Sequence, residues 1–159
     1  MGEIDETTTR WLEADQQESW RAFLGGTTVL MEKLDRDLRC AHDVSMGEYE
    51  ILVRLSEAPD HSVRMAELAT QVAHSRSRIT HTIARLERAG LVTRGQCSED
   101  GRGVCAVLTA HGYDTLRAAA HTHVRGVRDY LVDIAGDEEF GVIGRVMERV
   151  RSHLGGAEF

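Results

Sequence analysis

Residues 76–89 are predicted to form an amphipathic helix with two chemically different faces. At about 100° per residue, Ile79, Ile83 and Leu86 lie together on an apolar face. The opposite face carries hydrogen-bonding and cationic side chains, namely Ser77, Arg78, His81 and Arg85. An arginine can donate two hydrogen bonds to the N7 and O6 atoms of guanine, and it also pairs with phosphate. This face therefore favours contact with DNA; the alternative is an ordinary solvated helix face.

The loop between two short β-prone segments, residues 91–96 and 104–108, is a second candidate for the same chemistry. Arg102 is predicted at its tip between two glycines, which permit a sharp turn. Asp100 can hold the guanidinium by charge-assisted hydrogen bonds, so that Arg102 is ready to enter a minor groove. The alternative is an ion pair that serves only the loop.

The elements that must position these residues are predicted to be helices with one β-hairpin. Ser45 and Glu48 form a capping-box pattern, and Pro59 ends the helix that they open. Ser75 is predicted to cap the helix 76–89, and Gly90 to end it. The predicted order is a helix over 20–38, a helix over 46–58, a short strand over 62–64, helices over 65–73 and 76–89, the hairpin over 91–108, a long helix from 110 to about 135, and a last helix through Leu154 after a break at Gly136.

Two short helices joined by a tight turn and followed by a β-hairpin are typical of a winged helix-turn-helix. The expected fold class is mainly α with a small β-hairpin wing, together with a helical dimerisation region. The apolar stripes Trp20–Leu38 and Phe140–Leu154 predict a dimer, because a monomer of this size would expose too much apolar surface.

Composition and charge narrow the class of protein. The 159 residues are 42% apolar and 28% charged, which is ordinary for a globular protein, and no apolar run reaches the roughly 18 residues of a membrane span. The N-terminus lacks the apolar segment of a signal peptide, so a cytoplasmic location is expected. The net charge of −7 argues against a protein that binds nucleic acid, but acidic and basic side chains are concentrated in different parts of the chain. Residues 1–20 hold six acidic side chains and one arginine, whereas residues 74–94 hold five arginines and one glutamate.

The stretch Ser75-Arg-Ser-Arg-Ile-Thr-His-Thr-Ile-Ala-Arg-Leu-Glu-Arg-Ala-Gly-Leu-Val-Thr-Arg94, together with Asp100-Gly-Arg102-Gly103 and Leu108-Thr109, resembles the recognition helix and wing of the MarR family of bacterial transcription regulators. The segments Tyr49–Leu52 and Met65–Ala69 resemble the helices before them. From the helix face, the loop and this resemblance, the expected DNA-contacting residues are Ser75, Ser77, Arg78, His81, Arg85, Arg94, Asp100 and Arg102.

The resemblance implies a homodimer whose terminal helices interlock and whose two lobes bind double-stranded DNA at a near-palindromic operator. Residues 1–43 would then supply N-terminal dimerisation helices and part of a ligand pocket. Residues 44–109 would form the DNA-binding lobe, and residues 110–159 the C-terminal dimerisation helices. Repression is the commoner mode in this family, with release by a small-molecule, redox or metal input.

A urate-responsive branch of the family resembles the chain further and implies an anionic or aromatic effector. The branch has an extra N-terminal helix with a tryptophan, an acidic residue and two arginines around the turn motif, which here correspond to Trp11, Asp35 (or Asp37), Arg64 and Arg76. The wheel places Arg76 beside the apolar stripe, which favours an inward role. The alternative is that the two arginines are partners in structural ion pairs.

Other inputs have weaker sequence support. Three cysteines are an odd number without metal-type spacing, so no disulfide framework is expected. Cys97 in the wing is the candidate for a thiol-based redox sensor, while Cys40 and Cys105 suit inert packing. His121 and His123 point about 200° apart on a helix and cannot chelate one ion, so neither a metal nor a cofactor is expected.

Catalysis is not expected, because the chain has no phosphate-binding loop, nucleotide-binding glycine motif or nucleophile elbow. Ser75 and His81 are the nearest serine–histidine candidates, and they lie more than a turn and a half apart. The opposing class is a winged-helix module that binds protein without binding DNA.

Overall fold

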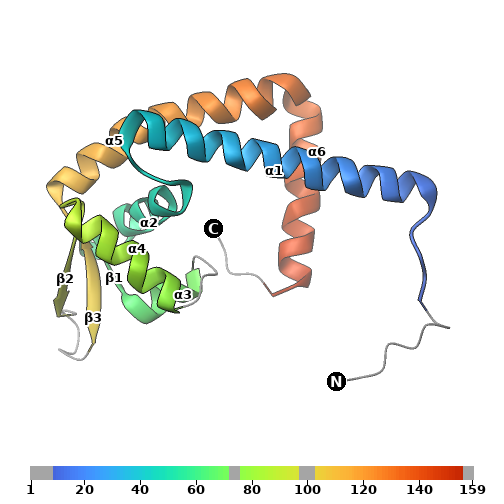
Figure 1. The fold of residues 1–159 in the computed structure, drawn as a ribbon. Coiled ribbons are helices and arrows are strands. Elements are labelled where there is room, and N and C mark those ends of the chain that lie inside the picture. The colour runs from blue at the N-terminus through green and yellow to red at the C-terminus, as the bar shows by residue number, and fades with distance from the viewer. Residues whose placement is uncertain (1–8, 72–75, 97–102, 156–159) are drawn as a thin grey trace.

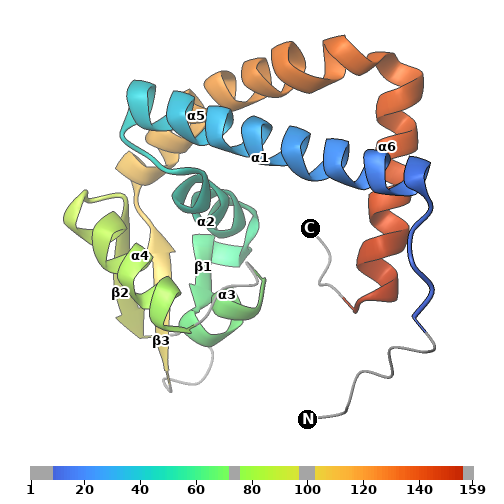
Figure 2. The same cartoon turned by 45° about the vertical axis from the view of Figure 1, so that its right-hand side comes forward.

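The computed structural model of the protein describes residues 9–71, 76–96 and 103–155. The long helices α1 (Ala14–His42) and α5 (Ala110–Val127) lie side by side (Figure 1). A small lobe, residues 44–108, packs below them and contains three helices and a sheet. The last helix, α6 (Asp133–His153), turns away from the end of α5 and stands apart from this lobe in both views (Figure 2). The described parts contain no helix long and apolar enough to cross a membrane.

Helix α1 begins before the predicted residue 20, because Glu13 and Gln16 form a capping box at its start. It ends at Asp43, whose left-handed backbone (φ 52°) lets its N–H bond the Arg39 carbonyl. Its first half is exposed to solvent, and its buried residues, Leu34 and Leu38, belong to its second half. Only that second half is therefore anchored in the folded chain.

The helices of the lobe follow the predicted caps. Helix α2 (Met46–Glu57) begins with the predicted capping box, because Ser45 accepts from the Glu48 backbone N–H and the Glu48 carboxylate accepts from the Ser45 N–H. A 3-10 turn (η1, Pro59–His61), the strand β1 (Ser62–Arg64), helix α3 (Met65–Gln71) and helix α4 (Arg76–Arg88) follow. Gly90, with φ 72°, ends α4 as predicted.

The sheet has three strands rather than the two of the predicted hairpin. Strands β2 (Val92–Gln96) and β3 (Val104–Leu108) pair antiparallel, and β1 pairs with the other edge of β3, so the order is β1-β3-β2. The short segment predicted as extended thereby satisfies hydrogen-bonding groups of β3 that a hairpin would leave open. The structure confirms the expected class, a mainly helical winged helix-turn-helix with a small β wing.

The core of the lobe lies between α2, α4 and the sheet, and the end of α1 closes it. Its largest fully buried side chains are Leu38, Val44, Ile51, Leu52, Leu55, Leu68, Ile79, Ile83, Leu86 and Val92. At its edge, α5 approaches the residue before β2 so closely that a Cβ at Gly112 would lie 2.0 Å from the Leu91 carbonyl oxygen. Only glycine fits there.

The C-terminal helical region differs from the prediction in one way. A π-helical segment, η2 (Arg128–Val132), separates α5 from α6 where one helix was predicted through residue 135. The break predicted at Gly136 is confirmed, because the glycine has a non-helical backbone (φ 74°) and α6 is kinked there into two helical parts. Beyond it, large apolar side chains of α6 are exposed: Val142, Ile143, Val146, Met147, Val150 and Leu154.

Candidate nucleic-acid interface

Helix α4 presents the two faces that its sequence predicts. Ile79, Ile83 and Leu86 are buried against the core of the lobe, and His81 is exposed on the other side. Because α3 precedes α4 and the β2–β3 hairpin follows it, α4 occupies the place of the second helix in a helix-turn-helix (Figure 1). The predicted apolar face of this helix is confirmed.

Several predicted contact residues cannot be placed by their side chains. Arg76, Ser77 and Arg78 form the first turn of α4, but only their helical backbone is described. Ser75, Asp100 and Arg102 lie outside the described residues. Their assignment to DNA therefore stays a prediction.

Arg94 connects β2 to α4. Its Nε lies 3.2 Å from a carboxylate oxygen of Glu87, and its Nη2 donates to the Thr80 carbonyl at 3.3 Å. Both partners belong to α4, so this arginine holds the helix against the strand at the base of the wing. Its side chain is still partly exposed beside α4.

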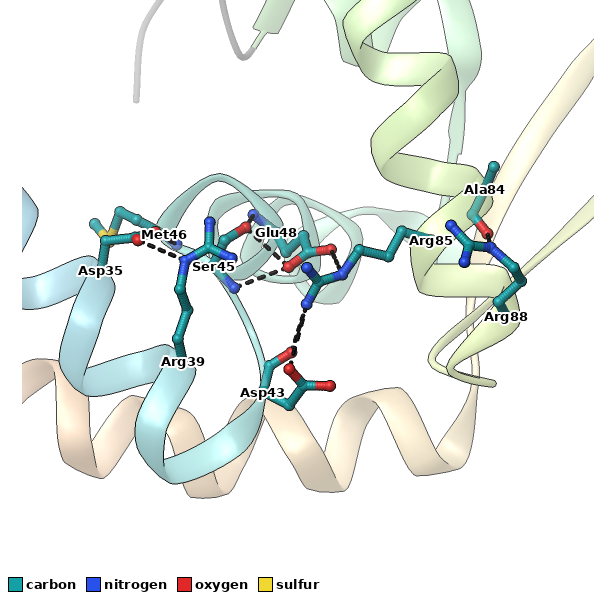
Figure 3. Close-up of polar contacts among 9 residues, drawn as sticks. All are labelled: Asp35, Arg39, Asp43, Ser45, Met46, Glu48, Ala84, Arg85 and Arg88. Atoms are coloured by element: carbon teal, nitrogen blue, oxygen red, sulfur yellow. Dashed lines mark hydrogen bonds and ion pairs between the residues drawn. The ribbon is translucent and has the colours of Figure 1, made fainter.

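Arg85 makes contacts within the protein that the sequence did not predict, while its side chain stays 39% exposed. Its Nε lies 2.7 Å from Oε1 of Glu48, and its Nη2 donates to the Asp43 carbonyl at 2.8 Å. The guanidinium therefore faces the corner between α1 and α2 (Figure 3). The wheel located its Cα correctly but could not show where a side chain of this length ends.

Glu48, which sequence reasoning recognised only as a capping residue, is the buried partner in this contact. It is 3% exposed, and no other polar or charged residue of the described chain is classed as buried. Its Oε2 accepts from both the backbone N–H and the hydroxyl of Ser45, each at 2.8 Å, and its Oε1 is left for Arg85. The capping pattern signals the first role; nothing local in the sequence signals the second.

Asp35, a predicted effector ligand, braces the same corner. Its Oδ1 accepts from the Met46 backbone N–H at 2.8 Å, and its Oδ2 lies 2.6 Å from Nε of Arg39. Burial acts to raise the pKa of Asp35, but the hydrogen bonds from Arg39 and Met46 outweigh it and hold the pKa below its ordinary value. The carboxylate stays ionised and ties α1 to the start of α2.

The structure does not bring the predicted effector residues of one chain together. Trp11 lies in non-helical chain before α1 and is 78% exposed, so residues 9–13 add no separate N-terminal helix. Asp35 lies about 30 Å further along α1, at 1.5 Å per residue. Arg64 is half-buried in β1, and the Arg76 side chain is not described. Within one chain, Trp11 and Asp35 thus cannot line the same pocket.

The cysteines differ from expectation at one position. Cys105 is buried in β3 and is disulfide-bonded, so the prediction that it is an inert packing residue is wrong. Cys40 is free and exposed on α1, and Cys97 lies outside the described residues. No group of three or more possible metal ligands occurs within ranges 9–71, 76–96 and 103–155.

Known proteins resemble this arrangement. The profile of the MarR family matches residues 44–104, which is the lobe with its wing. AbsC, a MarR family transcriptional regulator from Streptomyces coelicolor, is 40% identical; the match covers 94% of this chain and all of AbsC, with a TM-score of 0.86. Sco3205 from the same organism, a MarR family regulator whose structure contains DNA, is 39% identical over 91% of this chain and 94% of its own, with a TM-score of 0.85. The transcriptional repressor YetL of Bacillus subtilis (strain 168) is 27% identical over 67% of this chain and 66% of its own length.

Proposed function

Because the chain belongs to the MarR family of transcriptional regulators, we propose that it is a sequence-specific DNA-binding repressor that acts as a homodimer. It is a regulator and not an enzyme. The observation that carries the proposal is the position of α4, whose buried face is fixed on the lobe while its other face is open beside the β2–β3 wing. The similarity to Sco3205, a regulator with bound DNA, supports the same reading.

In this proposal, the first turns of α4 enter a major groove and the wing reaches an adjacent minor groove. The proposed contacts are Ser75, Ser77, Arg78, His81, Arg94, Asp100 and Arg102. Arg85 is left out of this set because Glu48 and Asp43 already bind its guanidinium.

The proposed dimer uses the helices that flank the lobe, residues 1–43 and 110–159. Apolar side chains along the first half of α1 are exposed, including Trp20 (51%) and Phe23 (41%), and α6 exposes an apolar stripe as well. Such surfaces commonly mark an interface. Two lobes in one dimer require half-sites about 10 bp apart, one turn of the duplex.

Repression and its release are the finer parts of the proposal. The similarity to YetL, which is named a repressor, supports repression. Release by a small aromatic or urate-like anion rests on Arg64 and Arg76, which flank the turn motif in the sequence. A bound anion would make the position of α4 depend on ligand, since Arg76 opens that helix.

A selection experiment tests the DNA-binding proposal. Duplexes selected by the protein from a randomised library should contain a near-palindrome, and a gel shift should detect binding to DNA upstream of its own gene. Arg78→Ala should weaken binding by more than about 1 kcal/mol, and a panel of small aromatic anions should lower the affinity of the wild type. Failure to enrich any sequence, with no retention on heparin, would favour the protein-binding alternative.

The disulfide at Cys105 favours a second candidate input, thiol oxidation. Cys105 lies in β3, the strand that returns from the wing, so its redox state could alter the wing. Dithiothreitol, which reduces a disulfide to two thiols, should then change DNA affinity in the wild type and in Cys40→Ser but not in Cys105→Ser. Equal sensitivity of all three proteins would exclude Cys105 as the sensor.

A further inference from the structure

We propose that Glu48 positions the recognition helix α4 for DNA by holding Arg85 against the corner between α1 and α2. The inference rests on the proposed function, since it concerns how the DNA-reading helix is held. It assigns Arg85 to a contact inside the protein rather than to the duplex. Figure 3 shows the contacts that carry it.

The Glu48 carboxylate is placed as an anchor by its surroundings. Its side chain is 4% exposed, and the Ser45 backbone N–H and hydroxyl fix one oxygen at the start of α2. A buried carboxylate needs a partner for its charge, because two neutral donors do not replace the water it has lost. The Nε of Arg85 supplies that partner at 2.7 Å.

Arg85 reaches two elements at once. While its Nε meets Glu48 of α2, its Nη2 donates at 2.8 Å to the carbonyl of Asp43, the residue that ends α1, and lies 3.6 Å from the Asp43 carboxylate. Only a planar guanidinium can serve both partners in this way, since its donors form a fixed fork. One side chain of α4 thus bridges α1 and α2.

The corner that receives Arg85 is itself held by hydrogen bonds and an ion pair. Asp35 in α1 accepts from the Met46 backbone N–H and pairs with Arg39, and Asp43 closes α1 through its bond to the Arg39 carbonyl. The orientation of α1 is therefore passed through this corner to Arg85. Because α1 also belongs to the proposed dimer region, the bridge relates the angle of each α4 to the dimer.

Removal of the bridge is expected to shift α4 rather than to unfold it. Ile79, Ile83 and Leu86 still bury the apolar face of the helix, and Arg94 still holds it from β2. If only part of the population keeps α4 in the binding orientation, the apparent Kd rises in inverse proportion to that fraction. Loss of either partner should then weaken DNA binding by the same route.

Charge and geometry separate this role from a phosphate contact. A phosphate contact needs the positive charge of residue 85, which Arg85→Lys retains. Each such contact makes the slope of log affinity against log salt steeper by about 0.9. The bridge needs the fork, which Lys lacks, and it adds nothing to the salt slope. Arg88 provides a matched control, because it is an exposed arginine of the same helix that bonds the Ala84 carbonyl of its own helix.

The first experiment measures fluorescence anisotropy with a duplex selected by the wild type. Glu48→Gln, Arg85→Gln and Arg85→Lys should each raise the Kd about tenfold and leave the salt slope unchanged. The double variant Glu48→Gln/Arg85→Gln should have a Kd no higher than that of the single variant that binds more weakly. Arg88→Gln should combine additively with Glu48→Gln. Wild-type affinity for both Arg85→Lys and Glu48→Gln, with a reduced salt slope for Arg85→Gln, would overturn the proposal.

The second experiment uses hydrogen exchange without DNA, so it stands even if the selection yields no duplex. Amides of residues 79–88 should exchange about tenfold faster in Glu48→Gln and in Arg85→Gln than in the wild type, because both lose the same bridge. Amides of α5 should keep their rates, and Arg88→Gln should match the wild type throughout. Unchanged exchange in α4 of both bridge variants would refute the positioning role, whereas failure of the wild type to bind any duplex would refute only the proposed function.

Discussion

The Tyr130 hydroxyl donates a 2.8 Å hydrogen bond to Asp37, and this bond joins the π-helical segment η2 to α1. Asp37 also binds Lys33, whose ammonium lies 4.8 Å from the centre of the Tyr130 ring. One turn away, a Cβ at Gly126 would lie 2.8 Å from Leu34, so α5 and α1 are in close contact here. The π-helical segment η2 thus begins where α1 and α5 are in close contact, and α6 follows it directly.

Tyr130→Phe should lower the free energy of unfolding by about 1 kcal/mol, because it removes a hydrogen bond to an ionised carboxylate. Tyr113→Phe is the control, since the Tyr113 hydroxyl has no partner in the portion of the chain that the structure describes. Urea unfolding of the two variants and the wild type gives the comparison. If Tyr130→Phe is as stable as Tyr113→Phe, the hydrogen bond between Tyr130 and Asp37 contributes no stability.

The contacts of Asp37 with Lys33 and Tyr130 also predict that the stability of the protein depends on pH. The hydrogen bonds from Lys33 and then Tyr130 hold the pKa of Asp37 below its ordinary value of 3.8. A carboxylate with a depressed pKa in the folded state stabilises the protein fully above the unfolded pKa, and this stabilisation is lost as pH falls through the folded pKa. Urea unfolding should therefore show a stability difference between wild type and Asp37→Asn that is constant from about pH 7 to 5 and shrinks below about pH 4. A difference that does not change with pH would show that the carboxylate charge is irrelevant.

Gly112→Ala should destabilise the protein by at least about 2 kcal/mol, because the added Cβ would meet the backbone of Leu91 and the side chain of Leu108. Gly26→Ala is the opposite control. Nothing lies within 4 Å of its added Cβ, and alanine favours the exposed part of α1 by up to about 1 kcal/mol. Thermal unfolding should give a Tm below that of the wild type for Gly112→Ala and above it for Gly26→Ala. A Gly112→Ala protein as stable as the wild type would show that α5 can move away from Leu91.

Local patterns predicted the elements well, because their signals lie within a few residues of each other. Ser45 and Glu48 are three residues apart, and Gly90 follows the last turn of α4 directly. The apolar face of α4 also follows from spacing alone. The predicted class of fold depended on the order of these elements and needed no long-range contact.

Contacts between distant residues were beyond such patterns. Strand β1 has three residues, and its pairing with β3 depends on a partner more than forty residues later. Glu48 and Arg85 each have a complete local interpretation, as a capping residue and as one arginine of a polar face, and only the folded chain brings them together. The proposed wing contact, Arg102, and the contacts proposed for the first turn of α4 rest on the sequence pattern.

Arg102→Ala should lower DNA affinity and reduce the slope of log affinity against log salt by about one, since it removes one cation from the minor groove. The measurement is fluorescence anisotropy over a series of salt concentrations, with the duplex selected by the wild type. Arg117→Ala is a suitable control, because this exposed arginine lies in α5 away from the wing and pairs with Asp114 of the same helix. Equal slopes for Arg102→Ala and the wild type would place Arg102 off the DNA.

Met147→Asp should convert the proposed dimer to monomers at micromolar concentration. Met147 is 40% exposed in the middle of the apolar stripe of α6, and a carboxylate buried there in an interface would lack a partner. Arg149→Asp introduces the same carboxylate about 200° away on the helix, where it should leave the dimer intact. Light scattering coupled to size exclusion gives the mass of each variant. Because two lobes bind a palindrome far more tightly than one, operator affinity should fall with the dimer. A wild type that is itself monomeric, or a dimeric Met147→Asp, would show that α6 does not hold two chains together.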